Sequence, residues 1–229
     1  MSQFDAYAAD YDAALNRGLS LSGESREYFA TERVKWVSRC LAELSARPTR
    51  VLDFGSGTGG TCPELLRQLD ADRVVGVDAS LESLNAARRV HVDSRLEFRT
   101  IQEMGSAGPF DLVYCNGVFH HVPPLERPAV LAGIRRSLAD DGYFAFWENN
   151  PWNPATRLVM SRIPFDRDAK LISPPRARSL LARAGFDVLR TDFLFFFPRL
   201  LAALRPLEIR LSRIPAGAQY LVLCRKLEC

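Results

Sequence analysis

The chain has 229 residues, 47% of them hydrophobic, with 30 Lys and Arg against 27 Asp and Glu. This length allows a full hydrophobic core that needs no disulfide bonds or structural metals, and the near balance of charge argues against a general attraction to nucleic acid. The five cysteines form no Cys-x-x-Cys pair, so we expect neither a disulfide framework nor a metal site. The amino-terminal residues lack the apolar core of a signal peptide, and no uncharged apolar run approaches about 18 residues. We therefore expect a cytoplasmic protein without stable membrane insertion.

Residues 24–45 carry apolar side chains at helical spacing and predict an amphipathic helix ahead of the first strand. β-rich and helical runs then alternate, which is typical of a parallel, doubly wound α/β sheet. We expect strands at 50–54, 73–78, 95–100, 110–115 and 142–148, and helices at 61–70, 80–90, 125–139 and 174–184.

A glycine-rich turn follows the first strand, with glycines at 55, 57, 59 and 60. Nothing bulky there blocks the backbone from a ligand, and the helix that follows carries a predicted capping box at Thr61 and Glu64. Three of these glycines also satisfy Gly-x-Gly-x-x-Gly, the weak fingerprint of dinucleotide-binding proteins. Asp53 favours another ligand, because a fixed negative charge would repel a pyrophosphate and attract the cationic groups of S-adenosylmethionine.

The second strand ends in Asp78, 21 positions after Gly57. A carboxylate at this distance is where a neighbouring parallel strand would present it to a ribose diol. The two segments together predict an adenosine-containing ligand.

The acidic-x-Gly-x-Gly-x-Gly pattern of Asp53, Gly55, Gly57 and Gly59 resembles the class I S-adenosylmethionine-dependent methyltransferases. Further segments keep the family's order, and Phe119-His120-His121-Val122 is similar to the small-molecule branch that includes quinone-biosynthesis methyltransferases. The resemblance covers roughly residues 4–226. It implies a Rossmann-like, mostly parallel seven-stranded sheet with helices on both faces, in which 186–197 and 219–225 are the last two strands and the last is antiparallel. The cofactor-binding residues that it implies are Tyr11, Asp53, Gly55, Ser56, Gly57, Asp78, Ala79, Gln102 and Asn116.

Two segments outside the bare sheet are expected to shape the acceptor site. Residues 1–48 would form an amino-terminal helical lid, on which Tyr7 and Tyr11 either touch the cofactor or pack in the core. Residues 149–172 would form an insertion in the main domain, 49–229, beyond a strand end, where ligands of open α/β folds bind. The apolar, arginine-rich stretch 193–215 is read as a buried strand with a connecting helix; a substrate wall, a dimer face and a membrane-surface contact are its alternatives.

Acceptor chemistry is assigned to residues near the ends of the fourth and fifth strands. Removing a proton from a hydroxyl or an acidic carbon needs a base with a pKa near 7, which favours His120 or His121. Glu148 could accept a proton or grip the acceptor. Each of the three could instead be structural, and His91 is expected to be so.

We therefore predict an enzyme that transfers a methyl group from S-adenosylmethionine to a small-molecule acceptor. The alternatives are an NAD(P)-dependent oxidoreductase and a cofactor-binding protein without turnover. Nucleic acid is not expected as a partner, whereas a homodimer is compatible with the sequence.

Overall fold

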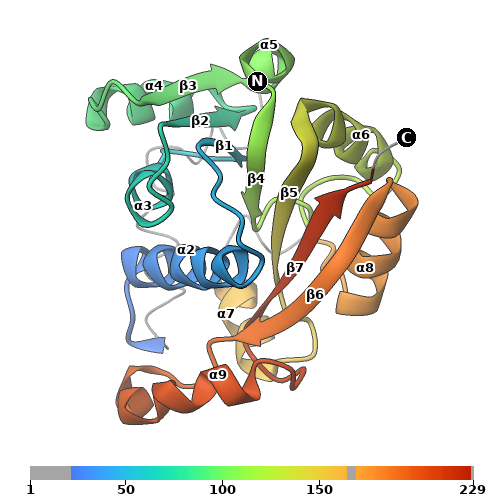
Figure 1. Cartoon of the computed structure of the whole chain (residues 1–229). Helices are drawn as coiled ribbons and strands as arrows, with labels where there is room; N and C mark the ends of the chain where they lie inside the picture. The colour runs from blue at the N-terminus through green and yellow to red at the C-terminus, as the bar shows by residue number, and fades with distance from the viewer. Residues whose placement is uncertain (1–21, 164–168, 228–229) are drawn as a thin grey trace.

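The computed structural model describes residues 22–163 and 169–227. The predicted Tyr7 and Tyr11 lie outside these residues. Seven strands form one sheet in the order β3-β2-β1-β4-β5-β7-β6. β7 pairs antiparallel with both β5 and β6, and β1 to β5 pair in parallel, so the predicted sheet with one antiparallel last strand is confirmed (Figure 1). The strands are β1 Arg50–Phe54, β2 Arg73–Asp78, β3 Leu96–Thr100, β4 Phe110–Asn116, β5 Leu138–Asn149, β6 Phe186–Leu194 and β7 Gln219–Lys226.

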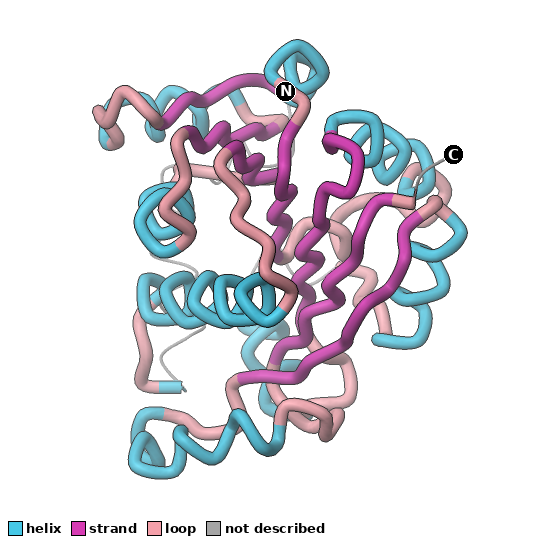
Figure 2. The backbone as a smooth tube through the Cα atoms, in the orientation of Figure 1, coloured by secondary structure: helices cyan, strands magenta, loops and turns pink. Residues whose placement is uncertain are grey.

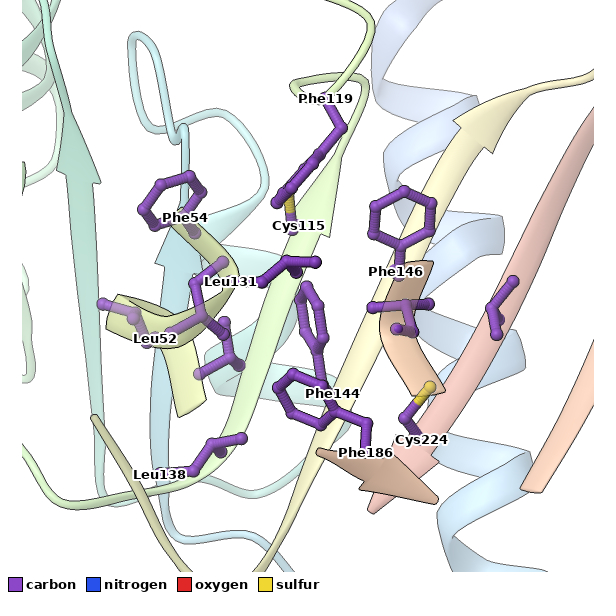
Figure 3. Packing of buried hydrophobic residues seen from close by; sticks show 14 of the residues in the cluster. Leu52, Phe54, Cys115, Phe119, Leu131, Leu138, Phe144, Phe146, Phe186 and Cys224 are labelled. Carbon is purple, nitrogen blue, oxygen red and sulfur yellow. The ribbon is translucent and has the colours of Figure 1, made fainter. Parts of the chain in front are cut away.

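Helices cover both faces of the sheet, because alternate side chains of each strand point to opposite faces. Leu52 and Phe54 join the core under α5, α6 and α8 (Figure 3). Val51 joins the core under α2, α3 and α4. The α-helices are α2 Arg26–Glu43, α3 Cys62–Gln68, α4 Leu81–Val90, α5 Met104–Ala107, α6 Arg127–Ser137, α7 Pro154–Arg162, α8 Pro174–Arg183 and α9 Glu208–Leu211, and the 3-10 helices η3 and η5 span Ile101–Glu103 and Arg199–Leu207.

The predicted capping box of α3 is wrong. Thr61 has helical backbone angles (φ −92°, ψ −25°), and its hydroxyl makes no capping hydrogen bond. A capping side chain needs an extended residue in front of the helix, which Thr61 is not. The Glu64 carboxylate accepts hydrogen bonds from Arg67 and Gln68 instead.

Two helical segments lie beyond the sheet edge at which β4 and β5 end (Figure 1). α7 follows β5, and η5 with α9 follows β6, so both come from connections longer than a turn. No helix among the described residues is long and apolar enough to cross a membrane.

Candidate active site

A cavity of about 380 Å³ lies at the ends of β1 and β4. Its walls come from the glycine turn, α2, the loop after β4, α7, and the segment that joins β6 to η5. A second cavity of about 140 Å³ lies beyond the end of β2. Gly55, Gly57, Asn116, Gly117 and His121 line both cavities, so the two meet at a shared wall.

The glycine turn has two different constraints. The amides of Gly55 and Ser56 donate to the Val77 carbonyl at 2.8 and 3.0 Å, which fastens the turn to β2. Gly55 has a φ of +77°, and a Cβ there would lie 2.3 Å from Cγ2 of Val118. Gly57 has a φ of +54°, but a Cβ there would meet no atom within 4 Å. Gly55 is therefore required by packing, whereas Gly57 leaves open space where a ligand can approach the backbone.

Asp78 lines the smaller cavity together with Ala79 and Ile101. Its carboxylate accepts the amide of Gly57 at 2.8 Å on Oδ2 and the amide of Ser80 at 2.8 Å on Oδ1. Each oxygen keeps a second lone pair for a ligand hydroxyl. Gln102 is exposed, and the side of this cavity nearest to it is lined by Ile101.

Asp53 lies in the wall of the larger cavity and is buried. Burial raises the pKa of its carboxyl to about 7, opposed by a hydrogen bond from the Cys62 thiol at 3.4 Å and by the charge of Arg33. Removal from water penalises the charged form, so a cation placed in the cavity would favour ionisation.

Arg33 is a buried cation in the same wall. Its Nε donates to the Tyr114 hydroxyl at 3.2 Å and its Nη1 to Gln219 Oε1 at 3.0 Å. No acid of the described residues forms an ion pair with it. α2 is held in place because Trp36 Nε1 donates to the Asp192 carboxylate of β6 at 2.9 Å. A buried guanidinium in a cavity wall is suited to binding a carboxylate.

His120 lies in the wall of the larger cavity, and Glu148 fixes its ring. The Nδ1 atom of His120 is 2.7 Å from Glu148 Oε2, and both side chains are buried. Glu148 Oε1 accepts the amides of Phe119 at 2.8 Å and His120 at 3.3 Å. Glu148 thus contacts the loop after β4. The His121 ring lies beside that of His120, with ring centroids 4.1 Å apart and the two planes tilted by 51°. His91 lines neither cavity, and its Nε2 lies 3.1 Å from the carbonyl oxygen of Thr58, which lines the smaller one.

Residues 24–191 match the family of methyltransferase domains, which is more than half of the chain. The chain belongs to the methyltransferases. The predicted alternative of a nicotinamide-dependent oxidoreductase is therefore wrong, and the methyl donor is S-adenosylmethionine.

Curated relatives and solved structures resemble this methyltransferase along most of its length. A malonyl-[acyl-carrier protein] O-methyltransferase from Geobacter sulfurreducens is 28% identical, over 93% of this chain and 79% of the relative. A trans-aconitate 2-methyltransferase from Methylobacterium nodulans is 30% identical, over 69% of this chain and 58% of the relative.

Among solved structures, a chain of the complex between the Haloferax volcanii Trm112 methyltransferase activator and a methyltransferase has a TM-score of 0.67 at 19% identity, covering 100% of this chain and 99% of that one. Human N-acetylserotonin methyltransferase in complex with SAM has a TM-score of 0.65 at 16% identity, covering 98% and 59%. These two likenesses concern the fold.

The site of the methyltransferase fits its cofactor on two observations. Among the described residues, no atom would lie within 4 Å of a Cβ at Gly57, and none forms a hydrogen bond with the buried Oδ1 of Asn116, in the wall shared by the two cavities. Gly57 thus leaves room for a ligand, and Asn116 offers it a hydrogen-bond acceptor, at the place where a polar ligand would pass from one cavity to the other.

Sequence reasoning missed Arg33, Tyr114 and Gln219, which come from α2, β4 and β7. A signal for Arg33 exists in the printed sequence. It falls on the apolar face of α2, between Ala30 and Val37, where a charged residue is out of place unless it has a function.

Proposed function

We propose that the methyltransferase transfers a methyl group from S-adenosylmethionine to a small-molecule acceptor, with the adenosine in the smaller cavity and the acceptor in the larger one. The shared wall at Gly55, Gly57 and Asn116 is the observation that carries this proposal. A cofactor crossing that wall has its reactive centre where the two cavities meet, and an in-line transfer needs the acceptor directly beyond it.

We infer that the cofactor is held by groups of complementary charge. Asp78 binds the ribose hydroxyls, Asp53 binds the ammonium of the methionine part, and Arg33 binds its carboxylate. Ser56 lines the larger cavity and Ala79 lines the smaller one. Tyr11 stays a prediction outside the described residues, and Gln102, which is exposed, is the weakest candidate for an adenine contact.

His120 is the proposed general base. A carboxylate only accepts hydrogen bonds, so Nδ1 carries the proton toward Glu148, and Nε2 is the nitrogen that can take a proton from the acceptor. Glu148 is buried away from the cavity and acts as a positioning residue. His121, which lines both cavities, is the alternative base.

When bound, S-adenosylmethionine supplies a methyl group already activated by the positive charge on sulfur. The task of the chain is then to orient the acceptor, exclude water and hold the released proton.

The acceptor is proposed to have an apolar body. Phe195, Phe196, Val159, Met160 and Ile163 line the larger cavity. A carboxylate oxygen is the second candidate for the methylated atom, because the buried Arg33 could hold an anionic acceptor and the relatives are named for malonyl and trans-aconitate substrates. A carboxylate is ionised at neutral pH and needs no base.

The finer organisation stays a proposal. Residues 1–48 would close over the larger cavity, which α2 lines, and 149–172 would form its acceptor side, where α7 lies. A cytoplasmic location, the absence of a nucleic-acid partner and a homodimer are predictions from the sequence.

Two measurements test the function. The first is calorimetric titration with S-adenosylhomocysteine, and the second is the transfer of labelled methyl groups to a panel of alcohols, amines and carboxylic acids. We expect micromolar binding and transfer to one class. His120→Ala should slow transfer to a hydroxyl by about 10² to 10⁴-fold but spare transfer to a carboxylate. Glu126→Gln, which changes an exposed residue, is the control. Binding without transfer to any acceptor would favour a cofactor-binding protein without turnover.

A further inference from the structure

The segment from Arg199 to Leu211 is helical, amphipathic and exposed. It comprises η5 and α9, and neither contains a buried residue. Leu200 is 92% exposed, and several other large apolar side chains of the segment and its flank are also exposed. They are Leu201, Leu204, Leu207, Ile209 and Ile214.

The polarity of this segment is inverted relative to an ordinary surface helix. Arg205 points inward, where its guanidinium lies 4.5 Å from the Tyr28 ring centroid and bonds Glu24 at 2.7 Å. Glu208 also points inward and accepts three successive backbone amides, those of residues 195–197, at 3.0 to 3.1 Å. The polar groups thus fasten the segment to the protein, and its leucines face out. An exposed apolar face of this kind marks a partner surface.

The outward charges of the segment are all positive. Glu208 is the one acid between residues 198 and 214, and it is turned inward. Arg199 and Arg210 are exposed, and just beyond the segment the exposed Arg213 reaches Asp192 at 3.4 Å. Leucines bordered by arginines are typical of helices that lie in the interface of an anionic membrane, because the lipid phosphates pair with the guanidinium groups.

The segment adjoins the larger cavity. Phe195, Phe196, Phe197 and Pro198 line that cavity. They belong to the connection that leads from β6 into η5, and Figure 2 shows the loop after β6 passing directly into a helical segment. A surface seated on lipid at this place would bring the cavity to the bilayer boundary.

We propose that Arg199–Leu211 is a docking surface for an anionic membrane, on which the enzyme rests without inserting. A second copy of the chain fits less well. Two symmetric copies would oppose their own arginines with no outward acid to neutralise them, and 13 residues are fewer than the roughly 20 to 30 a side of a stable dimer.

Sedimentation of the full chain with vesicles tests this surface without reference to turnover. We expect binding to phosphatidylcholine vesicles that contain phosphatidylglycerol, weaker binding to phosphatidylcholine alone, and loss of binding at high salt. The double variant Leu200→Ser, Leu204→Ser should lower the partition coefficient at least about tenfold. Arg210→Glu should lower it for the anionic vesicles.

Matched controls separate the segment from general stickiness. Leu125→Ser changes a leucine that is 95% exposed elsewhere, and Arg89→Glu changes an exposed arginine on α4. Both should bind vesicles like the unaltered chain, and all four variants should keep their affinity for S-adenosylhomocysteine. The proposal is overturned if the chain fails to bind anionic vesicles, or if the leucine variant binds them normally. It is also overturned if light scattering finds a dimer that only this variant dissociates.

Discussion

Glu148 holds His120 through two atoms at once: Oε2 lies 2.7 Å from the imidazole Nδ1, and Oε1 accepts the His120 amide at 3.3 Å. The side chain and the backbone of His120 are therefore oriented by one buried carboxylate at the end of β5. Because the carboxylate fixes the proton on Nδ1, the tautomer of the ring is set before any acceptor enters.

Glu148→Gln should lower kcat while leaving the affinity for S-adenosylhomocysteine unchanged. The amide oxygen would keep the two backbone hydrogen bonds, so the amide nitrogen would face Nδ1 and force the proton onto Nε2. His120 would then be the wrong tautomer for a base. We expect a loss of roughly tenfold or more, against about 10² to 10⁴-fold for His120→Ala.

The pH profile of kcat distinguishes a base from a structural ring. In the unaltered enzyme kcat should fall at acidic pH, as the base becomes protonated, and His120→Ala should lack this limb. A His120→Ala variant that keeps both turnover and the limb would move the role of base to His121.

Asp53 should make cofactor affinity depend on pH. Burial raises the pKa of its carboxyl to about 7, so at pH 6 most molecules carry a neutral Asp53. A ligand ammonium favours the ionised form, so the dissociation constant of S-adenosylhomocysteine should fall by up to about tenfold per unit as pH rises toward 7 and then level off. Calorimetry in two buffers of different ionisation enthalpy should find a proton released on binding below pH 7.

The same carboxyl also affects the ligand-free protein. Its pKa is about 3.9 in the unfolded chain and about 7 in the folded one, so the folded state binds the extra proton between these values. The free energy of unfolding should therefore fall as pH rises from about 4 to 7. Asp53→Asn removes that slope and the pH dependence of binding together. A variant that keeps both would show that another group is responsible.

Alanine substitutions at Gly55 and Gly57 should affect stability and cofactor binding differently. In Gly55→Ala the new methyl would lie 2.3 Å from Val118 Cγ2, so we expect a large loss of thermal stability. In Gly57→Ala the methyl enters open space, so stability should fall only by about 1 to 2 kcal/mol for the left-handed backbone. Cofactor affinity should nevertheless drop sharply. Thermal denaturation and calorimetry on both variants check the contrast; equal stability losses would contradict it.

Much of the fold could be predicted because its signals are local. β1 and β2 end where Gly55 and Asp78 interrupt runs of apolar residues, and both strands have the predicted bounds. β5 begins earlier than predicted because Leu138 pairs with Phe110 across a register shift. That pairing joins residues far apart in the chain and leaves no local pattern.

The site was predictable where one segment carries the whole signal. Asp53 and the glycines belong to one segment, whereas Arg33 lies on α2, which the hydrogen bond from Trp36 to Asp192 joins to the distant strand β6. The outward direction of the η5 leucines could not be predicted either, because it depends on the hydrogen bonds that turn Glu208 inward.

Arg33→Met should weaken the binding of S-adenosylhomocysteine by about 10- to 100-fold, because a charged hydrogen bond to the carboxylate of its amino-acid part is lost. 5′-Methylthioadenosine, which lacks the amino-acid part, should bind this variant as it binds the unaltered enzyme. Asp78→Asn is the matched comparison and should weaken both ligands, because both carry the ribose, and Arg89→Met on the surface of α4 should affect neither. If Arg33→Met leaves both affinities unchanged and raises only the acceptor KM, the guanidinium holds the acceptor, which would favour a carboxylate substrate.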